Sequence, residues 1–147
     1  MTYKITNALR IISIIVLVFV FFISYAGLPE QVLIIIDAKG DPTQYVARDI
    51  FFYSSLTFII LSNILIYVLS IILLKTTKQR MILIANYLMA LATLINVFIS
   101  VELSFLGVLN GRENFNYSYF SPFFFLSGGL FVIWVFSFII SLLRTKK

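Results

Sequence analysis

The chain alternates between long uncharged hydrophobic runs and short polar segments. The uncharged runs cover 11–29, 50–74, 81–101 and 114–143, which are 19, 25, 21 and 30 residues long. A helix of about 20 apolar residues crosses the hydrocarbon core of a bilayer. None of the runs alternates between apolar and polar residues as an outer-membrane strand does. The pattern therefore predicts an all-α integral membrane protein with four transmembrane helices.

We expect a single four-helix membrane domain that covers residues 1–147. Its helices are expected at about 8–27, 50–74, 81–105 and 120–143. The segments that join them are then 28–49, 75–80 and 106–119. Pro29 marks the end of the first helix, because a proline disfavours a helical residue before it and supplies no backbone donor.

Composition supports the membrane assignment and excludes several kinds of site. Hydrophobic residues make up 61% of the chain, charged residues 12%, and the mean hydropathy is +1.06. Cysteine and histidine are both absent, which removes disulfides, thiolate and bis-histidine metal sites and the usual general base near neutral pH. With the carboxylates scattered and no nucleophile–base pair, we expect no enzyme, no cofactor and no metal.

Charge distribution predicts the topology. Lysine and arginine accumulate in short cytoplasmic loops, so the side with more of them is expected to be cytoplasmic. One side would carry Lys4, Arg10, Lys75, Lys78, Arg80, Arg144, Lys146 and Lys147, and the other Lys39, Arg48 and Arg112 with all six acidic residues. Both termini are therefore expected in the cytoplasm, with segments 28–49 and 106–119 outside. Because the basic residues flank hydrophobic runs, the net charge of +5 predicts no nucleic-acid partner.

The first run has a competing interpretation. Lys4 and Arg10 precede a mostly apolar stretch that ends with the small residues Ser24 and Ala26, as in a cleavable signal peptide. Cleavage after Ala26 would leave three spans and an outer amino terminus. We expect an uncleaved anchor.

The polar segment LPEQVLIIIDAKGDPTQY, residues 28–45, has the composition of an outer connection with a tight turn. Val32 to Ile36 is a mostly β-branched run that predicts a short strand or an interfacial segment. The turn formers Gly40 and Pro42 follow, and Asp49 is expected to cap the second helix. A calcium site at Asp37 and Asp41 is disfavoured, because calcium loops carry denser carboxylates.

Within residues 28–48, which include this segment, Leu28, Pro29, Asp37, Gly40, Pro42, Tyr45 and Arg48 match a pattern in order and spacing. They resemble the short extracytoplasmic motif of DUF1648, a domain of small bacterial membrane proteins that also begins immunity proteins related to the sporulation-delay-toxin immunity protein. The resemblance implies a bacterial inner (cytoplasmic) membrane. It also makes Asp37, Gly40, Pro42, Tyr45 and Arg48 a candidate outer docking loop. Leu33 and Ile35 stand where the family tends to have proline and histidine, so no task of that histidine carries over.

Polar and small residues inside the spans are candidates for helix packing. The set is Asn63, Asn86, Thr93, Asn96, Gly128 and Gly129. Amide and hydroxyl side chains can bond between helices, and small residues let backbones approach closely. A transport path is the alternative, but Glu102 is expected at the outer end of the third span, leaving no charge deep in the membrane. Gly107 and Gly111 form a GxxxG that we expect to belong to a loop.

Three classes of function stay open. The expected one is a non-catalytic inner-membrane protein that acts through helix packing and outer-loop contacts as an accessory subunit of a larger bacterial membrane complex. The first alternative is an immunity or sensor protein that recognises an extracytoplasmic toxin or peptide. The second is a small transporter or channel component. The expected partners are membrane lipid and a larger integral membrane complex.

Overall fold

The computed structural model describes residues 3–36, 42–111 and 120–145. Its elements follow in the order α1 (Tyr3–Ala26), β1 (Gln31–Ile36), β2 (Pro42–Ala47), α2 (Arg48–Leu74), α3 (Gln79–Gly111) and α4 (Ser121–Arg144). In the described part of the chain these four helices are long and apolar enough to cross a membrane. The prediction of four such helices is confirmed, and a small two-stranded sheet is added to them.

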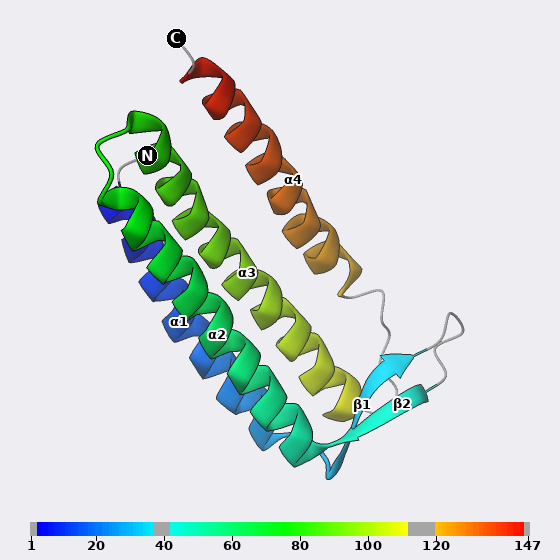
Figure 1. Ribbon diagram of the computed structural model, residues 1–147. Helices are drawn as coiled ribbons and strands as arrows, with labels where there is room; N and C mark the ends of the chain where they lie inside the picture. Colours follow the sequence, from blue (N-terminus) through cyan, green and yellow to red (C-terminus); the bar gives the residue numbers. More distant parts are fainter. Residues whose placement is uncertain (1–2, 37–41, 112–119, 146–147) are drawn as a thin grey trace.

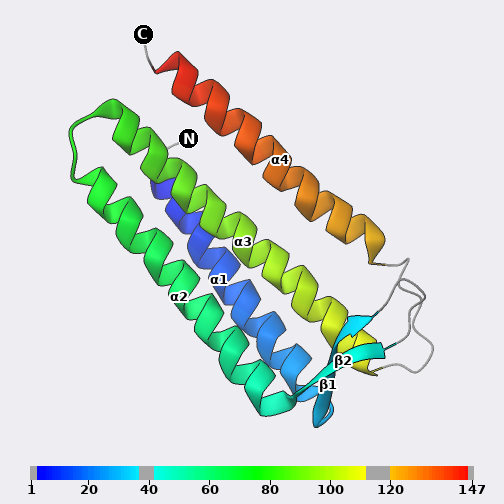
Figure 2. The ribbon, with the colours of Figure 1, turned by 45° about the vertical axis from the view of Figure 1, so that its right-hand side comes forward.

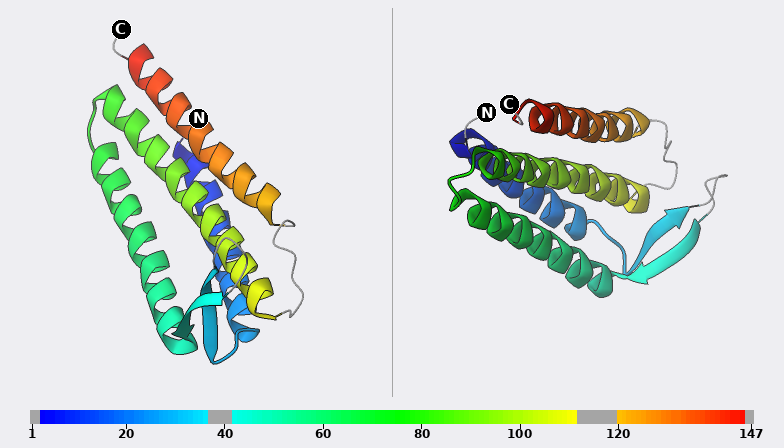
Figure 3. Two further views of the ribbon diagram at one scale, coloured as in Figure 1. Left: turned by 90° about the vertical axis from the view of Figure 1, so that its right-hand side faces the viewer. Right: turned by 45° about the horizontal axis from the view of Figure 1, so that its top comes forward.

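The helices lie roughly side by side, with α3 between α4 and the pair formed by α1 and α2 (Figure 1, Figure 2). Both chain termini lie at one end of the bundle, which we call the terminal end. The two strands project at the opposite end, the hairpin end (Figure 1). Two further views show α4 running along α3 on the side away from α2 (Figure 3).

A buried apolar cluster lies among α1, α2 and α3, between the middle of the bundle and the hairpin end. Leu17, Phe21, Ile59 and Leu103 form a buried cluster. The ring of Phe52 stacks on Phe21, with 5.2 Å between ring centroids. Lipid chains are as apolar as these side chains, so the hydrophobic effect does not drive helices together within a membrane. Close packing of this kind holds them together instead.

Three details at the helix ends differ from the expectation. α1 begins at Tyr3 and α3 continues to Gly111, beyond the expected 8 and 105. The N-cap of α2 is Ala47, without a side-chain hydrogen bond, and Asp49 lies inside the first turn. The capping role expected for Asp49 is therefore wrong, although its carboxylate still lies near the positive end of the helix.

The segment expected as an irregular or strand-like connection contains an antiparallel hairpin. Leu33 pairs with Tyr45 and Ile35 with Gln44, so Ile34 is an extra residue, as in a β-bulge. Val32 and Leu33 are buried where the hairpin meets the helices. The hairpin is therefore a docked element of the fold.

Candidate functional site

A polar contact joins three helices at one level of the bundle. The side-chain Nδ2 of Asn96 on α3 donates to Ser13 Oγ on α1 at 3.0 Å and to Asn63 Oδ1 on α2 at 3.2 Å. Asn63 Nδ2 donates back to Asn96 Oδ1 at 2.8 Å. All three side chains are buried, and Asn96 is fully so. The structure thus brings together two of the packing candidates and adds Ser13, whose place in a largely apolar run gave no signal.

The other two candidates on α3 do not join this contact. Thr93 Oγ1 donates to the Met89 carbonyl of its own helix at 3.3 Å. The Oδ1 atom of Asn86 is buried without a hydrogen-bond partner. Both residues line the seam between α1, α3 and α4. Their surroundings therefore differ from those of Asn96, although the sequence pattern places all three on one helix face.

The seam holds two neighbouring cavities that share Leu9 and Thr93 in their walls. The one nearer the hairpin end has a volume of about 570 Å³ and reaches Phe120 and Phe123. The one nearer the terminal end has a volume of about 680 Å³ and reaches Gln79 and Ser141. They exist because α4 packs on α3 and stands away from α1 (Figure 2).

Aromatic and hydroxyl groups attach α4 to α3. The hydroxyl of Tyr87 lies 2.7 Å from Ser137 Oγ and 2.8 Å from Ser141 Oγ. Trp134 Nε1 donates to the Tyr87 carbonyl at 3.1 Å, and the Phe138 ring lies against the Tyr87 ring, with 5.1 Å between centroids. Near the other end of α4, Phe105 meets Phe124 edge to face. The attachment runs along one face of α4 only.

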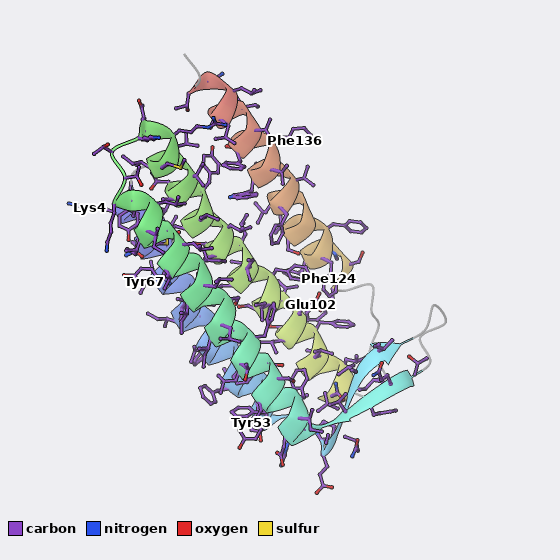
Figure 4. All side chains as sticks on the ribbon, viewed as in Figure 1. Lys4, Tyr53, Tyr67, Glu102, Phe124 and Phe136 are labelled. Atoms are coloured by element: carbon purple, nitrogen blue, oxygen red, sulfur yellow. The ribbon has the colours of Figure 1, made fainter. Side chains whose placement is uncertain are left out.

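The opposite face of α4 carries the predicted glycine notch. Gly128 and Gly129 are exposed, and a Cβ built on either would meet nothing within 4 Å in the described structure. Ser127 beside them is the single residue of α4 that is buried. Large apolar side chains such as Phe125 and Phe136 are exposed on this helix. Phe136 projects from it into the surroundings (Figure 4). The notch is therefore open and unused for packing within the described chain.

Gly107 contradicts the expectation of a loop glycine. It lies inside α3, where an added Cβ would be 3.3 Å from Ser24 Oγ and 3.4 Å from Ser24 Cβ on α1. Such separations are tight, so the absence of a side chain lets α1 and α3 approach. Gly111, the other member of the GxxxG, meets nothing within 4 Å.

Asn110 fixes the hairpin to α3. Its Oδ1 accepts a bond from the Leu33 backbone N–H at 2.8 Å, and its Nδ2 donates to the Leu33 carbonyl at 3.0 Å. The amide side chain thus takes the place of a neighbouring strand at the outer edge of β1. The sequence pattern did not single out Asn110, since its partner is a backbone group 77 residues away.

Of the candidate docking loop, Asp37 and Gly40 lie outside the described residues, and Pro42 pairs with Ile36 at the start of β2. Tyr45 is 53% exposed on β2. Arg48 is only half-buried and reaches inward: one of its guanidinium nitrogens, Nη1, donates to the Leu28 carbonyl at 3.4 Å, and the group lies over the Tyr25 ring. Tyr45 is therefore available for contact, whereas the Arg48 side chain joins the start of α2 to the end of α1.

Glu102 lies further from the end of its helix than expected. Asn96 meets Ser13 and Gly107 meets Ser24, an offset of 83 residues in both cases, which sets residue 102 level with residue 19. Residue 19 is near the middle of the uncharged run 11–29. α3 also continues for nine residues beyond Glu102 (Figure 4). Glu102 therefore lies well inside α3 and not at its end, whereas the expected end of this helix at 105 placed it three residues from the end.

Among the described residues, no group of three or more acidic, histidine or cysteine side chains could hold a metal ion. Comparison with protein-family models, curated proteins and solved structures finds no match for this chain. The resemblance of residues 28–48 to DUF1648 therefore stays a prediction. The described structure therefore presents three surfaces for contact. They are the open face of α4, the exposed side of β2, and the seam between α1, α3 and α4.

Proposed function

We propose that this chain is a non-catalytic, multi-pass protein of a bacterial inner membrane that acts as an accessory subunit of a larger membrane complex. The observation that carries the proposal is the open face of α4. Three helices share buried polar and aromatic contacts, while α4 is attached on one side and leaves Gly128 and Gly129 uncovered. A small-residue notch lets a second helix backbone approach closely, which is the main source of helix association in lipid.

Charge at the two ends supports an orientation with both termini in the cytoplasm. The terminal end carries the basic residues Lys4, Arg10, Lys75, Lys78, Arg80 and Arg144. The described acidic residues are Glu30, Asp49 and Glu102, and they lie in the hairpin half. An excess of lysine and arginine in short segments favours the cytoplasmic side. The hairpin would then face outward.

The test is purification of tagged chain from its native membrane in a mild detergent, followed by mass spectrometry of associated proteins. The double variant Gly128→Leu/Gly129→Leu fills the notch, and should lose a stoichiometric membrane partner while keeping its thermal unfolding midpoint. The matched control, Ile64→Leu/Leu65→Ile, changes exposed residues of α2, on the side of α3 away from α4 (Figure 3), and should keep the partner. Recovery of the same large partner with the filled notch would refute the proposal.

The hairpin favours a second candidate, an immunity or sensor protein that recognises an extracytoplasmic peptide. Asn110 holds β1 against α3, so the exposed Tyr45 and Ile35 stand on a fixed support. Tyr45→Ala tests this interpretation without disturbing Arg48, whose contacts belong to the fold. Loss of protection against a toxin by Tyr45→Ala, with the α4 double variant fully protective, would favour this function over the subunit.

A further inference from the structure

The terminal-end cavity of the seam changes from polar to apolar along its length. Most of its polar lining lies toward the terminal end, beside the apolar Ile82 and Leu83, and comes from three helices: Thr6 on α1, Gln79, Asn86 and Tyr87 on α3, and Ser137 and Ser141 on α4. Deeper in the membrane the walls are Leu9, Ala90, Leu94 and Leu130. A molecule that follows this gradient has a polar head at the terminal end and an apolar tail toward the centre.

The cavity has the length of one leaflet. From Gln79 to Leu94 the lining of α3 covers 16 residues, and the 15 steps between them correspond to about 22 Å of helix at a rise of 1.5 Å per residue. Half of a hydrocarbon core of about 30 Å is about 15 Å, which leaves room for part of a headgroup. The cavity is open to its surroundings on one side, because α4 stands away from α1 (Figure 2). A lipid can therefore enter sideways from the bilayer.

The charge around the polar end is one-sided. Two of the three helices carry a basic residue close to a lining residue at this end: Arg80 follows Gln79 on α3, and Arg144 lies three positions beyond Ser141 on α4. The described acidic residues all lie in the other half of the molecule. Basic pockets between membrane helices favour anionic headgroups over neutral ones.

We infer that this cavity binds one anionic glycerophospholipid of the adjoining leaflet. Its phosphate lies near Arg80 and Arg144, and one acyl chain runs past Ala90 and Leu94 toward Thr93. A transmembrane helix of a partner fits the site less well, because most of the polar lining, with Thr93 as the exception, lies at one end together with Arg80 and Arg144.

Trp134 provides a direct probe, because it is the single tryptophan and lines this cavity. The full chain is reconstituted into phosphatidylcholine vesicles that contain increasing fractions of phosphatidylglycerol with brominated acyl chains, which quench tryptophan on contact. A parallel series uses brominated phosphatidylcholine in unbrominated phosphatidylcholine. We expect half-maximal quenching at a mole fraction about ten-fold lower for the anionic lipid. Coincident curves for the two lipids would overturn the inference.

Variants separate this site from general contact with lipid. Ala90→Phe fills the terminal-end cavity and should abolish the preference, whereas Val97→Phe, in the wall of the neighbouring cavity, should leave it unchanged. Arg80→Gln/Arg144→Gln alters two exposed residues and should bring the two curves within about two-fold of each other. An unchanged preference in both the filled and the neutral variants would overturn the inference. Loss of a homodimer in Ala90→Phe, with quenching unchanged, would assign the cavity to a second copy instead.

Discussion

Asn63 and Asn96 exchange side-chain hydrogen bonds across the α2–α3 interface, at 2.8 and 3.2 Å. Asn96 extends the contact to Ser13 on α1, so one fully buried amide joins three helices. Water is excluded at this depth, and a carboxamide without partners there would be costly. The contact fixes the rotation of each helix about its own axis, which an apolar surface alone leaves undetermined.

Asn96→Leu should lower the free energy of unfolding by about 1 to 3 kcal/mol, because up to three interhelical bonds of about 0.6 to 1.7 kcal/mol each are lost. Unfolding in mixed micelles with increasing dodecyl sulfate, followed by circular dichroism, measures this. Asn86→Leu is the control, since its Oδ1 has no partner and its loss should cost clearly less. Equal losses for the two variants would contradict the assignment.

Gly107→Leu should separate α1 from α3. Even a Cβ would lie 3.3 Å from Ser24 Oγ, so the larger side chain has no room unless the helices move. Overpacking of this kind costs about 1 to 3 kcal/mol. Crosslinking between cysteines introduced at exposed positions of α1 and α3 should become slower in the variant. Gly111→Leu is the control. A Cβ at Gly111 would meet nothing within 4 Å, so this variant should leave the crosslinking rate unchanged.

Asn110→Ala should release the hairpin from α3. The Leu33 N–H loses its acceptor and the Leu33 carbonyl its donor, two bonds of about 1 kcal/mol net each. We expect the Leu33 amide to exchange with deuterium at least about ten-fold faster. Thr43→Ala removes a bond within the hairpin and serves as the control. If Thr43→Ala speeds exchange at Leu33 as much as Asn110→Ala does, the hairpin is not held by Asn110.

Tyr87→Phe should loosen α4. The hydroxyl lies within hydrogen-bond distance of Ser137 and Ser141, and its removal should cost about 1 kcal/mol. Trp134 donates to the Tyr87 carbonyl, so its emission reports how firmly α4 is attached. The variant should lose the native emission at a lower dodecyl sulfate concentration. Tyr53→Phe, at an exposed ring on α2, is the control and should lose its native emission at the same dodecyl sulfate concentration as the unaltered chain. If Tyr53→Phe lowers that concentration as much as Tyr87→Phe does, the Tyr87 hydroxyl does not hold α4.

The number of helices was predictable because each span needs a long uncharged run, and 11–29, 50–74, 81–101 and 114–143 supply four. The ends of the helices were less predictable. α3 continues through Gly107 and Asn110 to Gly111, because these residues contact α1 and the hairpin, whereas glycine and asparagine read alone indicate a loop. Tertiary contacts outweigh local preference at such positions.

The sequence by itself determined the class of molecule: four apolar helices, no cysteine or histidine chemistry, and an uneven charge at the two ends. Only the tertiary structure decided which faces meet. Inner and outer faces are both apolar in a membrane protein, so the hydrophobic pattern does not distinguish them. The choice is made by a few specific contacts, such as Asn96 with Asn63, Gly107 against Ser24 and Asn110 on Leu33, whose partners lie between 33 and 83 residues away along the chain.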